Sequence, residues 1–290
     1  MGRTLSFKQA VREVTPPFAW RLLRRALGKL LAADFGFLWT DYPKFLLRSD
    51  AFRRFVISRN SMWRMAVAER IAGRFSGPLE RLGSDYGGWK VPTGLLGRKP
   101  IVYSLGIGDD MTFDLAIIER LGAEVFAFDP TPIAKQHVEQ TAADVASFHF
   151  LPFGIWSSDT EIKFFVPRDD SDVSHSIVNL QGTDEFFMAR VLTLRSAMEK
   201  LGHASIDYLK IDIEGAQFDV LKSAIRDKVS FKILAVEIDQ PSLLSRAVDL
   251  LARLDAAGYE LIDIDGWNFL LVHRGLLHED QERRAFAAAT

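Results

Sequence analysis

The sequence contains no cysteine among its 290 residues. This absence excludes disulfide bonds, zinc sites built on thiolates and a cysteine nucleophile, and it is compatible with a reducing compartment. The chain also lacks an apolar run of about 18 residues, the length that a membrane-spanning helix requires. No apolar segment typical of a secretion signal follows its first charges. We therefore expect a soluble, cytoplasmic protein without a transmembrane segment.

Neither sign of charge dominates, because 36 Lys and Arg residues stand against 38 Asp and Glu residues, a net charge of −2. Nucleic-acid binding is driven largely by neutralising phosphates, so no nucleic-acid partner is expected. Hydrophobic residues make up 48% of the chain, which is ample material for a core. Since domains commonly have about 100–150 residues, the length fits one large α/β domain with an added segment.

The character of the chain changes near Gly87–Gly88. Before this point the pattern is helical, with long runs at residues 18–31 and 52–75. Residues 76–100 are rich in glycine and proline, which predicts a linker or an irregular lid rather than a packed element. After residue 100, short apolar strands alternate with helices, and this alternation predicts parallel βαβ units in a mainly parallel, doubly wound sheet.

The strands are predicted at residues 101–105, 124–128, 148–153, 161–166, 176–180, 190–193, 206–213, 231–238, 259–264 and 268–273, and the helices at 111–121, 133–144, 194–201, 216–225 and 243–257. The Asp265–Gly266 pair between the last two strands is typical of a hairpin turn, so we expect an antiparallel strand at the end of the sheet. Ligands of such sheets bind beyond the carboxyl ends of the strands, where the strand order reverses.

A glycine turn follows the first predicted strand of the sheet. Residues 103–110 read YSLGIGDD, so an apolar strand runs into Gly106 and Gly108 and then into a helix. Glycine lets the backbone approach a ligand closely, and the helix offers its free N–H groups. The alternative is that these glycines serve only the geometry of the turn.

Asp129 ends the second strand, about twenty residues beyond the glycines, which is the spacing of an acid that accepts hydrogen bonds from ribose hydroxyls. Pro130 follows it in the sequence VFAFDPTP. The alternative is that Asp129 caps the next helix through this turn.

The position of Asp110 distinguishes between two nucleoside cofactors. The third glycine of the dinucleotide fingerprint is missing, and a negative charge at this turn would repel a pyrophosphate. S-adenosylmethionine has no phosphate and carries a sulfonium cation and an amino group, so acids at the turn suit it. The charge pattern therefore favours this methyl donor, with a nicotinamide-dependent oxidoreductase or epimerase as the alternative.

The segment YLKIDIEGAQ at residues 208–217 places Lys210, Asp212 and Glu214 on one face of a strand expected to be buried. Three charges there are costly unless they are used or paired. One hypothesis is that Asp212 lies beside the transferred methyl group and orients or deprotonates an acceptor hydroxyl. The alternative is a structural Lys210–Asp212 ion pair with Glu214 capping the helix.

Together, the pieces LKIDIEGA, FDPTP and GGW resemble the FkbM family of S-adenosylmethionine-dependent methyltransferases over roughly residues 88–269. The resemblance implies a Rossmann-like class I methyltransferase domain at residues 88–290, preceded by an N-terminal helical segment and linker at residues 1–87. It also implies S-adenosyl-L-methionine as the cofactor. The expected reaction is O-methylation of a sugar, a glycan or another small hydroxyl-bearing metabolite.

The site residues expected from the motifs and the resemblance fall into two sets. The cofactor-binding set is Ser104, Gly106, Gly108, Asp109, Asp110, Asp129, Pro130, Phe153 and Asp212, and the catalytic set is Asp212, Glu214 and His175. Ser104 replaces an acid that many methyltransferases carry, so recognition of the cofactor's amino group could fall to Asp109 or Asp110. Gln217 replaces the second Glu of the family signature. These departures keep open a non-catalytic partner protein with the same fold.

Two further residues have a structural as well as a functional interpretation. His175 lies between serines in a loop and could act as a general base, although most such histidines are only solvated. Phe153 could sandwich adenine or simply pack in the core.

A carboxylate-rich crevice is also expected, because Glu237 and Asp239 join Asp212 and Glu214 at the strand ends. Such oxygen ligands could hold a hard divalent cation. No spacing defines a coordination set, so no metal is expected.

The N-terminal helix expected at residues 20–31 carries Arg21, Arg25 and Lys29 on one side. A cationic amphipathic helix can make peripheral contact with a membrane surface. The alternative is that it docks on the catalytic domain with its basic face in solvent. The sequence leaves the acceptor and the oligomeric state open.

Overall fold

The computed structural model describes residues 50–165, 185–213, 215–238 and 242–289. By internal contacts the chain divides into two compact units, residues 1–71 with 240–248 and residues 72–239 with 249–290. In the first unit, helix α4 (Asp50–Ile71) confirms the helix predicted at residues 52–75. Asn60 of this helix is buried, and its Nδ2 donates a hydrogen bond to the Ser242 carbonyl at 2.9 Å. The helix predicted at residues 18–31 lies outside the described residues.

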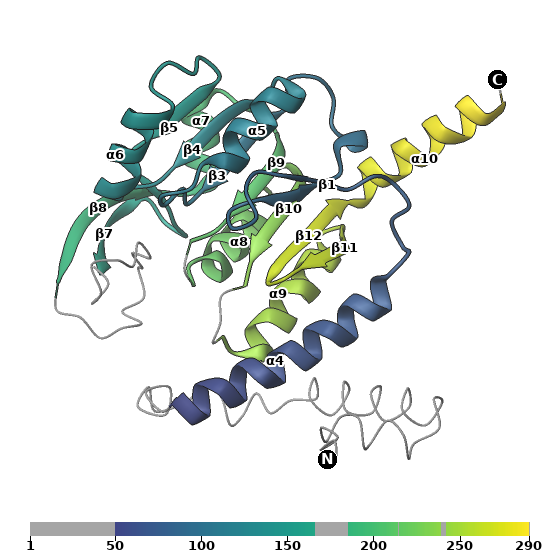
Figure 1. The fold of residues 1–290 in the computed structure, drawn as a ribbon, viewed down its shortest axis with the longest axis horizontal. Helices are drawn as coiled ribbons and strands as arrows, with labels where there is room; N and C mark the ends of the chain where they lie inside the picture. The colour runs from purple at the N-terminus through teal and green to yellow at the C-terminus, as the bar shows by residue number, and fades with distance from the viewer. Residues whose placement is uncertain (1–49, 166–184, 214, 239–241, 290) are drawn as a thin grey trace, which may run out of the picture. The chain divides into compact units, whose positions relative to one another are not determined.

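The second unit is built on a seven-stranded sheet with the order β11-β12-β10-β9-β3-β4-β5 (Figure 1). Its strands are β3 (Ile101–Leu105), β4 (Glu124–Phe128), β5 (Phe148–Leu151), β9 (Ile206–Ile211), β10 (Phe231–Glu237), β11 (Tyr259–Asp265) and β12 (Asn268–His273). Neighbouring strands from β10 to β5 are parallel, whereas β12 pairs antiparallel with both β10 and β11. The predicted mainly parallel sheet with an antiparallel strand at the end is therefore confirmed.

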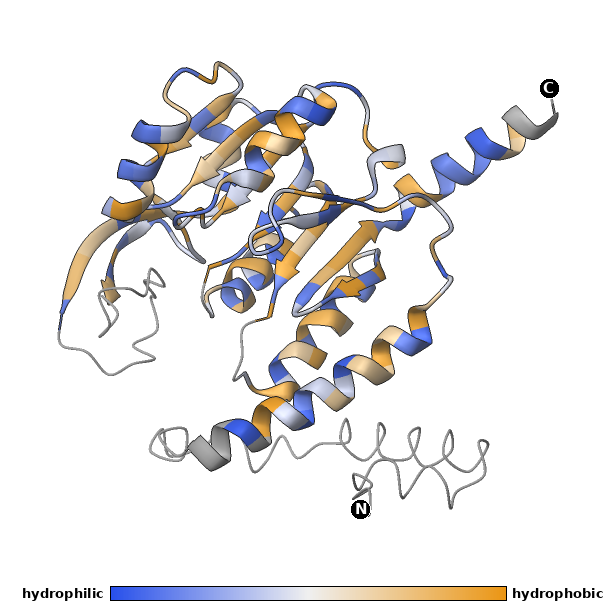
Figure 2. Cartoon of the chain, viewed as in Figure 1, coloured by the Kyte–Doolittle hydropathy of each residue, from blue (hydrophilic) through white to orange (hydrophobic). Residues whose placement is uncertain are grey.

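Helices connect these strands and cover the sheet. They are α5 (Thr112–Leu121), α6 (Pro132–Thr141), α7 (Leu194–Leu201), α8 (Gln217–Arg226) and α9 (Leu244–Ala256), whose first residues belong to the first unit. Local sequence sets their ends: Thr131 caps α6 by accepting a hydrogen bond from the Ala134 N–H, and Gly122, with φ of 66°, ends α5. Figure 2 shows apolar residues concentrated in the strands, as a sheet buried on both faces requires.

On the α5 side of the sheet, one hydrophobic core packs α5 against strands β3 and β9. Phe113 and Ile117 of α5 are buried in one cluster with Val102 of β3 and Tyr208 of β9. Tyr208 also donates a hydrogen bond through its hydroxyl to the Lys90 carbonyl at 2.9 Å. The glycine turn that follows β3 therefore lies directly after a strand that is packed in this core.

A β-hairpin corrects the expectation for residues 76–100. Strands β1 (Glu80–Leu82) and β2 (Trp89–Val91) pair antiparallel, and a short 3₁₀ helix, η2 (Thr93–Leu95), follows. Trp89 and Val91 are buried in the same core cluster as α5, so a linker or irregular lid is wrong for this part. Glycine and proline shape the tight turns of a packed element here, and the division by contacts falls after Ile71 rather than near Gly87–Gly88.

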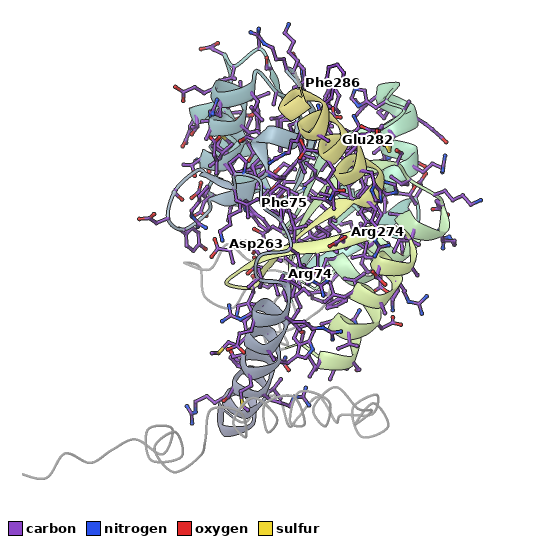
Figure 3. All side chains as sticks on the ribbon, turned by 90° about the vertical axis from the view of Figure 1, so that its right-hand side faces the viewer. Arg74, Phe75, Asp263, Arg274, Glu282 and Phe286 are labelled. Atoms are coloured by element: carbon purple, nitrogen blue, oxygen red, sulfur yellow. The ribbon has the colours of Figure 1, made fainter. Side chains whose placement is uncertain are left out.

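A second, three-stranded sheet with the order β6-β8-β7 is formed by β6 (Gly154–Ile155), β7 (Thr160–Phe165) and β8 (Phe186–Leu192). Strand β7 confirms the prediction at residues 161–166, and the strand predicted at 176–180 lies outside the described residues. The chain ends in helix α10 (Arg274–Ala289), which was not predicted. Glu282 and Phe286 lie on the outer part of this helix (Figure 3), where Phe286 is 74% exposed.

No helix in the described ranges is both long enough and apolar enough to cross a membrane.

Candidate active site

A pocket of about 300 Å³ lies where the strand order of the large sheet reverses, between β3 and β9. A volume of this size is at the lower end for small-molecule sites. The residues that line it are Tyr86, Gly87, Trp89, Gly106, Ile107, Gly108, Asp109, Asp110, Phe128, Asp129, Pro130, Thr131, Gly154, Ile155, Phe164, Lys210, Asp212, Ile213, Glu237 and Asn268. Most of them follow the carboxyl ends of parallel strands, as the position of the switch point requires.

The glycine turn after β3 makes close contact with the end of β9. Gly106 has a φ of +80°, and a Cβ atom added to it would lie 1.8 Å from the Asp212 carbonyl oxygen. The Asp212 N–H donates to the Leu105 carbonyl at 2.9 Å in the same region. Only glycine satisfies both requirements, and the turn is thereby joined to the strand that carries Asp212.

Asp129 organises this turn from the end of β4. Its Oδ2 accepts hydrogen bonds from the N–H groups of Ile107 at 2.9 Å and Gly108 at 3.2 Å. Its Oδ1 accepts from the N–H and the hydroxyl of Thr131, at 2.9 and 2.6 Å. A carboxylate has about four acceptor positions, so protein donors already use the full capacity of this buried group. Asp129 therefore lines the pocket and, through Thr131, orders the start of α6, in keeping with the capping interpretation, whereas its binding of ribose hydroxyls stays a prediction.

Asp110 connects the turn to the β1–β2 hairpin. Its Oδ2 accepts from the Ser84 hydroxyl at 2.7 Å, and its Oδ1 accepts from the N–H and the hydroxyl of Thr112. Burial pushes the pKa of Asp110 upward, but these hydrogen bonds and the charge of Lys210 outweigh burial and hold the pKa below its ordinary value. The carboxylate is thus a fixed negative charge at the pocket, and it accepts the hydrogen bond of the first N–H group of α5, that of Thr112.

Lys210 and Asp212 lie side by side at the end of β9. The Lys210 side chain is 4% exposed, and its Nζ donates to the Gly106 carbonyl at 2.7 Å. The same Nζ lies 3.9 Å from Asp212 Oδ2, while 35% of the Asp212 side chain is exposed. The predicted ion pair is therefore present, and it leaves Asp212 accessible from the pocket.

The far side of the pocket contains Glu237, which was expected in the carboxylate-rich crevice, together with residues that the motifs did not identify. Glu237 at the end of β10 pairs in register with Asn268 at the start of β12, and both line the pocket. Phe164 of β7 and the hairpin residues Tyr86 and Trp89 add aromatic surface. The Asp265–Gly266 turn could have identified Asn268. The strand that follows this turn runs antiparallel to β10, so its first residue lies beside the last residue of β10.

Two predicted cofactor-binding residues do not line the pocket. Ser104 is completely buried beneath the glycine turn, because alternation along β3 directs it toward α5. Phe153 instead packs edge-on against Phe128, with ring centroids 5.6 Å apart. His175, Glu214 and Asp239 lie outside the described residues. The other predicted cofactor-binding residues, Gly106, Gly108, Asp109, Asp110, Asp129, Pro130 and Asp212, lie together on the pocket wall.

Within the described ranges, no group of three or more His, Asp or Glu residues could hold a metal ion.

The site suits a cation and opposes a diphosphate. Among the described residues, five acids and one lysine line the pocket. The N–H groups of Ile107, Gly108 and Thr112, which would cradle a pyrophosphate, already donate to Asp129 and Asp110. These features fit the sulfonium and amino groups of S-adenosylmethionine and weigh against a nicotinamide dinucleotide. Fold and site thus define the class of Rossmann-like nucleoside-binding methyltransferases.

The family model of the methyltransferase FkbM domain matches residues 103–261, more than half of the chain. The protein therefore belongs to the FkbM methyltransferase family, and its cofactor is S-adenosyl-L-methionine. The sequence matches no curated protein at a significant level.

Solved structures with distant similarity include methyltransferases and fibrillarins. Aeropyrum pernix fibrillarin with natively bound S-adenosyl-L-methionine is 10% identical at a TM-score of 0.39, with 70% of this chain and 84% of that chain covered. A precorrin-6y C5,15-methyltransferase from Geobacter metallireducens GS-15 is 8% identical at 0.35, with 62% and 84% covered. A Methanococcus jannaschii fibrillarin pre-rRNA processing protein is 13% identical at 0.38, with 61% and 67% covered.

Proposed function

We propose that the protein methylates a hydroxyl oxygen of a small acceptor, such as a sugar or another hydroxyl-bearing metabolite, and that Asp212 is its catalytic residue. The observation that carries this proposal is the position of Asp212. It lies at the switch point of the sheet, with an accessible carboxylate in the pocket and a buried ammonium 3.9 Å away. A carboxylate in this place can accept a hydrogen bond from an acceptor hydroxyl and take its proton.

S-adenosylmethionine supplies a methyl group on a positively charged sulfur, which leaves with the bonding electron pair when the acceptor oxygen attacks. The protein contributes alignment and removal of the hydroxyl proton. The turn at Gly106–Asp110 and the residues Asp129 to Thr131 would hold the donor. Glu237 and Asn268 offer polar groups to the other hydroxyls of an acceptor, and Asp212 receives the proton as the new bond forms.

The test combines an acceptor screen with one pair of matched variants. Purified protein is incubated with isotopically labelled S-adenosylmethionine and a panel of sugars and other hydroxyl compounds, and NMR identifies the methylated atom. Asp212→Asn keeps the shape of the side chain but cannot take the proton, so turnover should fall by about 10²–10⁴. Binding of the demethylated cofactor should persist. Asp144→Asn makes the same chemical change at an exposed position away from the pocket and should behave as wild type.

Several outcomes would contradict the proposal. Methyl transfer to nitrogen or carbon would overturn the assignment to oxygen. Undiminished turnover in Asp212→Asn would remove the role of Asp212. Absence of turnover with any acceptor, together with normal cofactor binding and an unchanged cellular phenotype in Asp212→Asn, would favour the non-catalytic partner protein.

A further inference from the structure

A buried polar cluster lies beneath the glycine turn, on the face of the sheet that α5 covers. Ser104 and Lys210 are direct partners in the register of β3 and β9, and Asp114 in the first turn of α5 is completely buried. Among the described residues, the two carboxyl oxygens of Asp114 have no hydrogen-bond partner, and the Ser104 hydroxyl has none either. Buried polar groups in this state are rare and call for a physical explanation.

Lys210 connects this cluster to the pocket above it. Its ammonium donates to the Gly106 carbonyl at 2.7 Å and lies 3.9 Å from the Asp212 carboxylate. The ring centroid of Trp89 is 5.4 Å from the same nitrogen, close enough for a cation–π contribution. One buried cation thus holds the cofactor turn, the proposed catalytic carboxylate and the β1–β2 hairpin.

The protonation of Asp114 decides where this cation is directed. Burial raises the pKa of Asp114, and the charge of Lys210 only partly opposes this effect. Asp110, the other charged group that faces it, raises the pKa further. A protonated Asp114 is neutral, whereas an ionised one would attract the ammonium away from Gly106 and Asp212.

We propose that Lys210 is a positioning residue that couples the cofactor turn to Asp212, and that Asp114 is the neutral acid beneath it that leaves the ammonium directed at the pocket. The half of this proposal that concerns Asp212 rests on the proposed function. Cofactor binding is measured without any acceptor, so failure of the proposal and failure of the methylation assay are distinguishable.

The first experiment replaces Lys210 by methionine, which keeps the length of the side chain and removes its charge. Titration calorimetry measures the binding of S-adenosylmethionine and of its demethylated product. Because a hydrogen bond from a charged donor fixes the turn, we expect both compounds to bind about ten- to a hundred-fold more weakly. The loss should be smaller for S-adenosylmethionine, since removing a positive charge from the pocket favours a cationic ligand.

Lys232→Met is the matched control, because Lys232 lies on neighbouring β10 and pairs with Asp207 at the surface. It should bind both compounds as wild type does. Wild-type affinity in Lys210→Met would overturn the proposal. Equal losses for the two compounds would also overturn it, because they would indicate a general loss of structure.

The second experiment replaces Asp114 by asparagine, which has the same shape and is neutral at every pH. An acid whose pKa is raised on folding stabilises the protein fully below its unfolded pKa, and this stability is lost as the pH rises through the folded value. The melting temperature of the wild type should therefore fall relative to that of Asp114→Asn as the pH rises above the ordinary value of 3.8. Lys210 and Asp110 are common to both proteins, so their own titration largely cancels. A difference that does not change with pH would refute the neutral acid.

Discussion

Replacement of Asp129 by asparagine is the sharpest test of how the cofactor turn is built. Four protein donors converge on the two carboxylate oxygens of Asp129, from Ile107, Gly108 and twice from Thr131. An asparagine side chain has one oxygen with two acceptor positions, and its NH₂ group would face two of the same donors. Two hydrogen bonds to a charged acceptor are therefore lost whichever way the amide turns.

The structure gives the size of the effect. A hydrogen bond to a charged group contributes about 1.5–3 kcal/mol, so the loss of two corresponds to roughly 3–6 kcal/mol. Asp129 is 5% exposed, so water can replace these bonds only poorly. Domains unfold with about 5–15 kcal/mol in total, and the variant should retain only part of the wild-type stability.

Urea unfolding followed by circular dichroism measures this difference, with Asp144→Asn as the exposed control. Calorimetry with S-adenosylmethionine on the same samples separates the two roles of Asp129. If Asp129 only receives ribose hydroxyls, cofactor affinity falls while the unfolding free energy stays within about 0.5 kcal/mol of wild type, the range of a surface substitution. That result would refute the argument that Asp129 organises the turn.

Two further changes test the same region. Gly106→Ala should be strongly destabilised, because the added Cβ would meet the Asp212 carbonyl oxygen. Gly202 has a φ of +74° and nothing within 4 Å of an added Cβ, so Gly202→Ala should lose only the roughly 1–2 kcal/mol that the left-handed conformation costs. Equal urea midpoints for the two variants would contradict the close contact at Gly106. Asp110 has a lowered pKa, so its stabilising effect is complete above the ordinary value of 3.8 and is lost as the pH falls through the folded value. The stability difference between wild type and Asp110→Asn should therefore vanish in acid, and a constant difference down to complete protonation would contradict the hydrogen bonds from Ser84 and Thr112.

Periodicity and turn chemistry predicted the large sheet well. Strands β3 and β4 have the predicted bounds, because their apolar runs end abruptly at Gly106 and Asp129. The Asp265–Gly266 turn likewise predicted the hairpin of β11 and β12. These features are local, so a single sequence contains them.

The β1–β2 hairpin was not predictable in the same way. Its strands have three residues each, too few for a periodic pattern, and its glycines and prolines imitate a linker. Only tertiary packing shows that Trp89 belongs to the core.

The hydrogen bonds within the site could not be predicted from the sequence either. The motif placed Asp129 at the pocket, but the backbone donors that fill its acceptor positions depend on the three-dimensional path of the turn. Asp114 had a weak signal, since it lies three residues before Ile117 on the buried stripe of α5. A charged residue on such a stripe is unusual enough to single out.

The reversed direction of β12 has a consequence for acceptor preference. Because it runs against its neighbours, Asn268 reaches the pocket from the start of a strand, directly after a surface turn. Such turns tolerate substitution and changes of length better than the crossovers that join parallel strands. On the proposed role of Asn268 toward the acceptor, substitutions in this hairpin tip should change acceptor preference and leave the nucleoside end of the site as it is.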